Sequence, residues 1–360
     1  MKKAVGFMVG ILLFGSAFFP AQAAFTSLYV FGDSLSAASN NVPIGPYGYG
    51  DRWSNGRVWV EVLAQRQGLP FNPSNNISFF GNISGNMVDE VNSFTPPAPA
   101  SNVLVVIWVN NADLYYPATA SPPTLEGFNT VINQAQTNHY KAITNLYAKG
   151  IRTLIMPNVV DISTIPAFNK FTAYTNLFHQ ASTNYNAAFY ATLNRVRTNS
   201  SYSGLTIYIP DFFALLTNLL TYPTNYVVTN ALKNKLSIDA LGYLGNPSLT
   251  NGPGTNYIFW DAQDPTAMVH MWMANTAQQL ISPVRISKIT ALNGSNRLDM
   301  ANVPVGQNGL VIGRTNLLLG NWTTNVNNFN STNTTQSVFV PASGPTWFYR
   351  LSFPYSWTWP

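Results

Sequence analysis

Short and almost wholly apolar runs recur along the first two thirds of the chain. They cover residues 28–31, 103–109, 153–156 and 205–209. Runs of this kind are typical of parallel strands that are covered on both faces. The stretches between them, such as 125–149 and 174–197, have the length and periodicity of helices. We therefore predict an α/β fold with a doubly wound parallel sheet, in which a ligand binds at the carboxyl ends of the strands.

The pattern changes near Pro283. Beyond it the apolar positions alternate over short stretches, at 284–290, 310–313, 335–340 and 348–353. No helical pattern of useful length occurs there, and Asn308-Gly309 is predicted to form a hairpin turn. We interpret residues 283–360 as a small β-sandwich-like module, and residues 24–282 as a domain that folds without it.

The N-terminus has the pattern of an export signal. Lys2 and Lys3 precede an apolar run from Val5 to Phe19, and Ala21-Gln22-Ala23 is a small-x-small cleavage site. The alternative is a membrane anchor, but the run is shorter than the roughly 20 residues that a span needs. We predict that residues 1–23 are a signal peptide, that the mature protein has no membrane span, and that it is secreted or periplasmic.

Composition narrows the classes of function. Of 360 residues 46% are hydrophobic and only 9% are charged, against about 25% in an average protein. The formal net charge of +5 is too small and too scattered to indicate nucleic-acid binding. The chain has no cysteine, which excludes disulfides, zinc–thiolate sites, iron–sulfur clusters and cysteine nucleophiles.

A candidate nucleophile directly follows the first apolar run. In the tetrad Gly32-Asp33-Ser34-Leu35 the glycine permits a sharp turn, and Ser34 emerges at the carboxyl end of the predicted strand. This is where a parallel sheet presents a reactive hydroxyl.

With this tetrad the chain resembles the GDSL (SGNH) family of serine ester hydrolases over residues 27–281. Four later segments are similar to the family's sequence blocks: 53–61, 76–81, 108–113 and 260–266. The resemblance implies a flavodoxin-like α/β fold and hydrolysis of esters without a cofactor or metal. It also implies that an ester-bearing small molecule, a lipid or a polysaccharide is the substrate.

Three of the family's catalytic positions match this chain and two do not. The resemblance makes Ser34 the nucleophile, Gly81 an oxyanion donor and Asp261 the residue that orients the base. The family's catalytic histidine is replaced by Asp264, and its oxyanion asparagine by Ala112. A carboxylate with an ordinary pKa of about 4 is a poor base at neutral pH, and alanine has no side-chain donor.

Neighbouring residues are further candidates for these two roles. A register shifted by one would place Asn111 at the asparagine position, but Asp113 would then fall out of line. His270 lies six residues after Asp264, in a helix that Pro265 is predicted to open, and would face away from it. We expect His270 and the two other histidines, His139 and His179, to be ordinary, partly exposed residues.

Four carboxyl groups, those of Asp33, Asp113, Asp261 and Asp264, are expected near one cleft. A cation site is one interpretation, because hard cations prefer oxygen ligands. The interpretation we favour is that backbone N–H groups satisfy these carboxyls in turns and caps. Repulsion between Asp261 and Asp264 would raise the pKa of one of them.

Aromatic residues crowd the end of the chain, at positions 347–349, 353, 355, 357 and 359. They could stack on sugars, or they could form a core and its edge, which is the commoner role. Two functions stay open. The chain is either an extracytoplasmic hydrolase of acyl or acetyl esters, or a catalytically degenerate relative that binds a carbohydrate or a surface partner.

Overall fold

The computed structural model describes residues 25–38, 52–226, 236–245, 254, 257–314, 322–341 and 347–353. The predicted signal peptide, residues 1–23, lies outside these ranges. Within them no helix is both long and apolar enough to span a membrane.

The main sheet has five parallel strands in the order β2-β1-β3-β4-β5. Their bounds are β1 Ser27–Gly32, β2 Asn76–Ser78, β3 Val103–Trp108, β4 Thr153–Ile155 and β5 Thr206–Tyr208. Every residue of β3 is buried, as expected for a strand covered on both faces. The predicted α/β fold with a doubly wound parallel sheet is confirmed.

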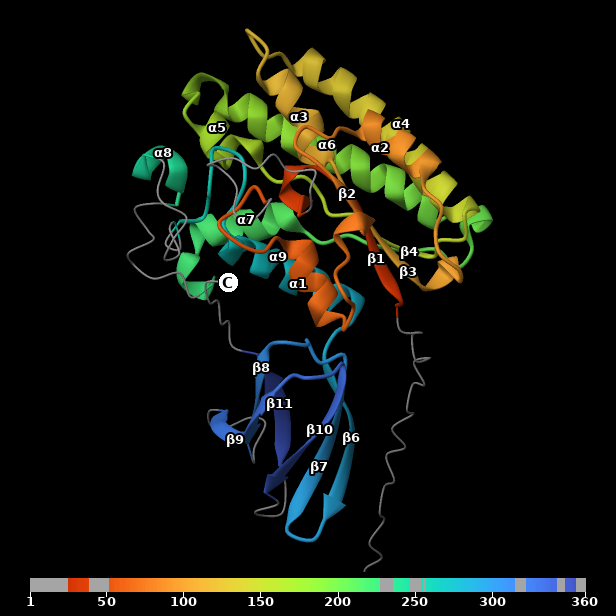
Figure 1. Cartoon of the computed structure of the whole chain (residues 1–360). Coiled ribbons are helices and arrows are strands. Elements are labelled where there is room, and N and C mark those ends of the chain that lie inside the picture. The colour runs from red at the N-terminus through yellow and green to blue at the C-terminus, as the bar shows by residue number, and fades with distance from the viewer. Residues whose placement is uncertain are drawn as a thin grey trace, which may run out of the picture.

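Helices cover both faces of this sheet (Figure 1), with α1, α7 and α9 on one face and α2, α4 and α6 on the other. The bounds are α1 Trp59–Arg66, α2 Ser84–Ser93, α3 Asn110–Ala118, α4 Leu125–Ala148, α5 Pro166–Asn169, α6 Thr175–Arg197, α7 Phe212–Thr221, α8 Ala240–Leu244 and α9 Ala267–Ile281. The long helix α4 begins where the Thr124 hydroxyl accepts a hydrogen bond from the Gly127 N–H at 3.1 Å, which satisfies a free donor of its first turn.

Three aromatic rings join the sheet to the helices below it. Trp59 of α1, Trp108 of β3 and Phe212 of α7 meet edge to face, with ring centroids 4.9–5.9 Å apart. The Trp59 indole also donates a hydrogen bond to the Ser36 hydroxyl at 3.0 Å. The core therefore holds the turn that follows β1, in which Ser34 lies.

The C-terminal region consists of two antiparallel sheets, β10-β7-β6 and β11-β8-β9. Their strands are β6 Arg285–Leu292, β7 Ser295–Ala301, β8 Asn308–Arg314, β9 Thr323–Asn330, β10 Thr335–Pro341 and β11 Phe348–Ser352. A separate apolar cluster, which includes Leu298, Met300 and Val311, fills the space between them. The predicted small all-β region is confirmed.

The hairpin predicted at Asn308-Gly309 is wrong, because both residues begin β8. Gly309 pairs with Phe329 of β9, whose ring lies where a side chain at position 309 would be. The hairpin instead turns at residues 293–294, between β6 and β7, where Gly294 has a φ of +78°. Gly309 is needed because the Phe329 ring packs against it, whereas Gly294 is needed for the backbone of the turn. The sequence alone does not distinguish these two reasons for a glycine.

The two regions meet between α9 and β6. Helix α9 ends at Ile281, and within the main region the Ser282 hydroxyl fixes this end by donating to the Gln67 side chain at 3.1 Å. The Val305 N–H also reaches the Arg66 carbonyl, at 3.5 Å. That residues 24–282 fold without residues 283–360 stays a prediction.

Gly32 ends β1 in a crowded position. A Cβ atom there would lie 2.7 Å from Ser36 Cβ and 2.8 Å from Ser78 Oγ. Only glycine lets the end of β1 approach both the turn that carries Ser34 and strand β2. This close packing of Gly32 against Ser36 and Ser78 fixes the position of the turn that contains Ser34.

We predict that Gly32→Ala lowers the free energy of unfolding by more than about 1 kcal/mol, as overpacking of a tight site does. The matched control is Gly85→Ala in α2, where the nearest side-chain atom, Ile83 Cδ1, is 3.9 Å away. Helix propensity favours alanine there by about 0.5–1 kcal/mol. Chemical denaturation measures the free energy of unfolding of both variants. Equal changes in the two would show that the crowding at Gly32 does not exclude a Cβ atom there.

Candidate active site

Ser34 lies in a short 3₁₀ turn, Ser34–Ser36, immediately after β1. The turn is capped by Asp33, whose Oδ1 accepts a hydrogen bond from the Leu35 N–H at 3.1 Å. Ser34 is 5% exposed and lines a cavity of about 250 Å³ at the carboxyl end of the sheet. The same cavity is lined by Gly81, Ala112, Tyr115 and Gln263, which come from three other segments.

Two of the residues that line this cavity have a backbone amide without an acceptor in the described part of the protein. In the described residues, the N–H groups of Ser34 and Gly81 donate to no backbone or side-chain acceptor. Gly81 has a φ of +78°, which favours glycine, and the Asn82 side chain fixes its loop by donating to the Gly32 carbonyl at 2.9 Å. The pair has the character of an oxyanion hole.

Asp261 and Asp264 belong to one tight turn. Asp261 Oδ1 accepts hydrogen bonds from the Gln263 N–H at 2.8 Å and from the Asp264 N–H at 2.7 Å. The Asp261 side chain therefore stabilises the turn formed by residues 261–264. The Asp264 carboxyl is 1% exposed, and neither of its oxygens has a partner in hydrogen-bond geometry.

The turn brings Asp264 beside Ser34. Burial, and then the charge of Asp261, raise the pKa of Asp264 well above its ordinary value of 3.8, while the nearby Ser34 hydroxyl lowers it. Burial also raises the pKa of Asp261 to about 6 and that of Asp33 to about 7. The site thus holds buried carboxyl groups that keep protons more tightly than free carboxyls do.

Sequence reasoning missed several residues that line the cavity, of which Tyr115 and Gln263 lie nearest in sequence to the predicted positions 112 and 264. Burial, followed by the charges of Asp264, Asp33 and Asp261, raises the pKa of Tyr115, so its hydroxyl keeps its proton. Tyr115 follows Ala112 by three residues in α3, and this spacing puts the two side chains on one helix face. Gln263 lies between the two aspartates of the turn. The helix spacing was the signal that could have found Tyr115.

Asn111 and Asp113 lie nearby but do not line the cavity. Asn111 Oδ1 accepts from the Val160 N–H at 3.2 Å. Asp113 accepts from the Ser84 N–H and from the Tyr185 hydroxyl, both at 2.9 Å. Both side chains are therefore held by the scaffold. In the part of the chain that the structure describes, no three His, Asp or Glu side chains are placed to hold a metal ion.

The expectation that all three histidines are partly exposed is wrong for two of them. His270 and His139 are fully buried, because they lie on the inward faces of α9 and α4. Burial lowers the pKa of each to about 3. No carboxylate acts on the pKa of His270, and it does not line the Ser34 cavity. Helix α9 begins at Ala267 rather than at Pro265.

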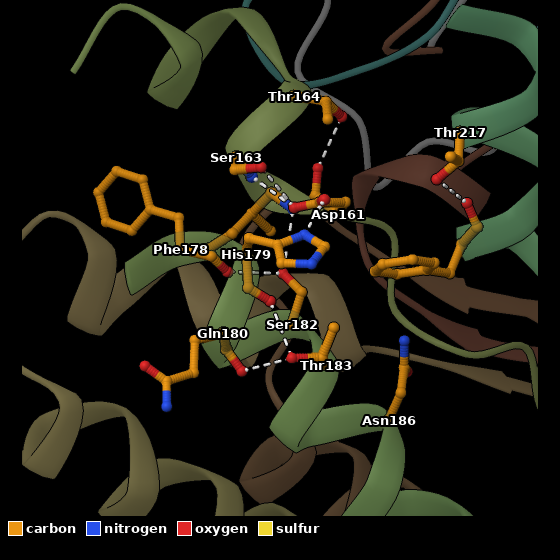
Figure 2. A network of polar contacts seen from close by, with 12 residues as sticks. Asp161, Ser163, Thr164, Phe178, His179, Gln180, Ser182, Thr183, Asn186 and Thr217 are labelled. Carbon is orange, nitrogen blue, oxygen red and sulfur yellow. Dashed lines mark hydrogen bonds and ion pairs between the residues drawn. The ribbon is translucent and has the colours of Figure 1, made fainter. Parts of the chain in front are cut away.

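His179 takes part in a separate network, shown in Figure 2. Its Nδ1 lies 2.6 Å from Asp161 Oδ2, and the Ser163 hydroxyl donates to Asp161 Oδ1 at 2.7 Å. A serine nucleophile has to donate to the imidazole, whereas this serine donates to the carboxylate. The network therefore caps the turn at residues 162–164 and contains no activated nucleophile.

Solved structures are similar to this chain in part. One is a lipase from a goat rumen metagenome, with a TM-score of 0.42 and 10% identity over 71% of this chain and 97% of that one. Another is a catalytic mutant of an acetylxylan esterase from Geobacillus stearothermophilus, with a TM-score of 0.41 and 12% identity over 71% and 94% of the two chains. No curated protein matches the sequence.

The sequence model of one protein family matches most of the main domain. It is described as GDSL-like Lipase/Acylhydrolase, and it aligns with residues 28–277. The match includes the strand that leads to Ser34 and the turn that carries Asp264. The chain therefore belongs to the GDSL-like lipase/acylhydrolase family.

Proposed function

We propose that this protein is a slow hydrolase of ester bonds, in which Ser34 is the nucleophile and Asp264 replaces histidine as the proton acceptor. The observation that carries the proposal is the buried Asp264 carboxyl beside Ser34, whose hydroxyl acts on the pKa of that carboxyl. The substrates are acyl or acetyl esters of lipids or carbohydrates. We further propose, from the N-terminal pattern, that the protein acts outside the cytoplasm.

Asp264 can move the proton in both halves of the reaction. The ionised carboxylate accepts the Ser34 proton as the hydroxyl oxygen bonds to the ester carbon. The carboxylic acid then returns this proton to the leaving alcohol oxygen, and an acyl–Ser34 ester remains. Water attacks that ester in the same way and restores Ser34. A base works best when its pKa lies near the working pH, so the raised pKa of Asp264 removes part of the mismatch of an ordinary carboxylate.

Three neutral donors can hold the negative oxygen that forms during attack. Two are the free N–H groups of Ser34 and Gly81. The third is the hydroxyl of Tyr115, which lines the same cavity and keeps its proton because its pKa is raised. In this proposal Tyr115 supplies the donor that Ala112 lacks.

A second candidate function is binding without turnover. The replacements at positions 264 and 112 favour it, because they remove the usual base and one usual donor while the cavity persists. The ligand would be a carbohydrate or a group on a surface partner. Turnover that depends on Ser34 separates the two functions.

We predict that Asp264→His combined with Ala112→Asn raises the rate of hydrolysis of an activated ester. General-base catalysis contributes about 10²–10⁴-fold, and one oxyanion donor about 10²–10³-fold. The combined gain should be smaller than the product, because groups that act together are not additive. The measurement is kcat/KM for p-nitrophenyl acetate.

The control for this gain is the additional change Ser34→Ala, which should return the rate to that of the blank. A folded double variant as slow as the wild type would show that the cavity no longer positions an ester. Fast, Ser34-dependent turnover by the wild type would exclude binding without turnover.

We predict that Tyr115→Phe, made in the Asp264→His background, lowers kcat/KM about 10²–10³-fold, the cost of one oxyanion donor. Adding Ala112→Asn should restore most of the loss, because the asparagine supplies a replacement donor. The matched control is Tyr222→Phe, since Tyr222 is 57% exposed and lines neither the Ser34 cavity nor the cavity beside it. An equal loss from both changes, or no rescue, would contradict the assigned role of Tyr115.

A further inference from the structure

A second, larger cavity adjoins the one at Ser34. It has a volume of about 450 Å³, and its apolar lining includes Pro122, Pro123, Phe168, Phe171 and Phe178. Thr119 and Gln263 line both cavities, so the two cavities adjoin at these residues, and together they are called the groove.

Aromatic rings form an unbroken wall along this groove. Tyr115, at the Ser34 end, packs against Phe168 with ring centroids 5.4 Å apart, and Phe168 packs against Phe178 at the same distance. Tyr174 continues the wall at 6.0 Å from Phe178. The Ala167 N–H donates to the Ala262 carbonyl at 2.8 Å, which fixes the wall to the turn that carries Asp264.

The lining of the second cavity is mainly apolar. Among the described residues that line it, the one charged residue is Lys170, whose ammonium lies 5.3 Å over the ring of Phe171, and the uncharged polar residues are Thr119, Ser121, Tyr174 and Gln263. The Thr119 hydroxyl already donates to the Tyr116 carbonyl at 2.9 Å. A sugar needs several convergent donors and acceptors for its hydroxyl groups, whereas an alkyl chain needs only apolar surface.

Apolar side chains also remain exposed where the groove opens. Phe80, Ile83 and Tyr116, on the rim of the Ser34 cavity, are 48%, 41% and 81% exposed. Phe171, in the second cavity, is 46% exposed. Large apolar side chains gathered around one opening indicate an apolar ligand.

We propose that this groove binds the alkyl chain of a medium- or long-chain acyl ester whose carbonyl group lies at Ser34. The inference rests on the proposed hydrolase function for the position of the carbonyl. It makes fatty-acyl esters, rather than acetyl esters, the better ligands. The alcohol part of the ester then leaves through the open side of the Ser34 cavity.

The test is equilibrium binding to the full chain with Ser34→Ala, which cannot turn over the ester. The probes are methyl butanoate, methyl hexanoate and methyl octanoate, measured by calorimetry. Each buried methylene should tighten binding about fourfold, so Kd should fall roughly 200-fold over the four methylenes that separate the shortest ester from the longest. An acetylated oligosaccharide is the polar comparison.

Two variants fill the groove and one is a matched control. Ala120→Trp and Ala167→Trp add a large ring to the lining, and both should abolish the dependence of Kd on chain length. Ala191→Trp places the same ring on the exposed face of α6, outside the groove, and should leave the series unchanged. Thermal melting confirms that each variant is folded.

Turnover is measured separately with the matching p-nitrophenyl esters. Binding that tightens with chain length, with no turnover by the wild type or by Asp264→His with Ala112→Asn, would support the groove and overturn the proposed hydrolysis. A Kd that is independent of chain length, or tighter binding of the acetylated oligosaccharide, would overturn the groove assignment whether or not the protein hydrolyses esters.

Discussion

The site depends on one buried carboxyl group. Asp264 is 1% exposed and lies beside Ser34, and the charge of Asp261 adds to the cost of ionising it. A charge in such a position is costly, and the group responds by holding its proton more tightly. The chemistry proposed for Ser34 depends on the raised pKa of Asp264. A solvent-exposed carboxylate with an ordinary pKa would be too weak a base to accept the Ser34 proton.

The scaffold holds Asp264 in this costly position through neutral contacts. The Ser54 hydroxyl donates to the Pro265 carbonyl at 3.0 Å, and Asn55 Oδ1 accepts from the Ala267 N–H at 2.8 Å. These contacts fix the start of α9 and with it the turn at residue 264. In this chain, in which only 9% of the residues are charged, uncharged amide and hydroxyl groups form the hydrogen bonds that fix the turn. Among the described residues, no cation acts on the pKa of Asp33, Asp261 or Asp264.

The sequence predicts the scaffold better than the site. Apolar runs such as 103–109 are typical of strands buried on both faces, so the sheet was predictable. Strand β2 was missed because its sequence, Asn76-Ile77-Ser78, has a single apolar residue and so forms no apolar run. Ser34 and Gly81 could be chosen by family resemblance. The burial of His270 and the pKa of Asp264 could not be predicted, since both depend on neighbours that are distant in sequence.

The most direct test of the account is the pH dependence of stability for the wild type and Asp264→Asn. The folded-state pKa of Asp264 is raised, so its contribution to stability is complete below the unfolded pKa of 3.8 and is lost as pH rises through the folded value. Chemical denaturation from pH 4 to pH 8 measures the effect. The account predicts that Asp264→Asn gains stability relative to the wild type as pH rises. A difference that does not change with pH, or that grows in the opposite direction, would contradict a proton-holding carboxyl beside Ser34.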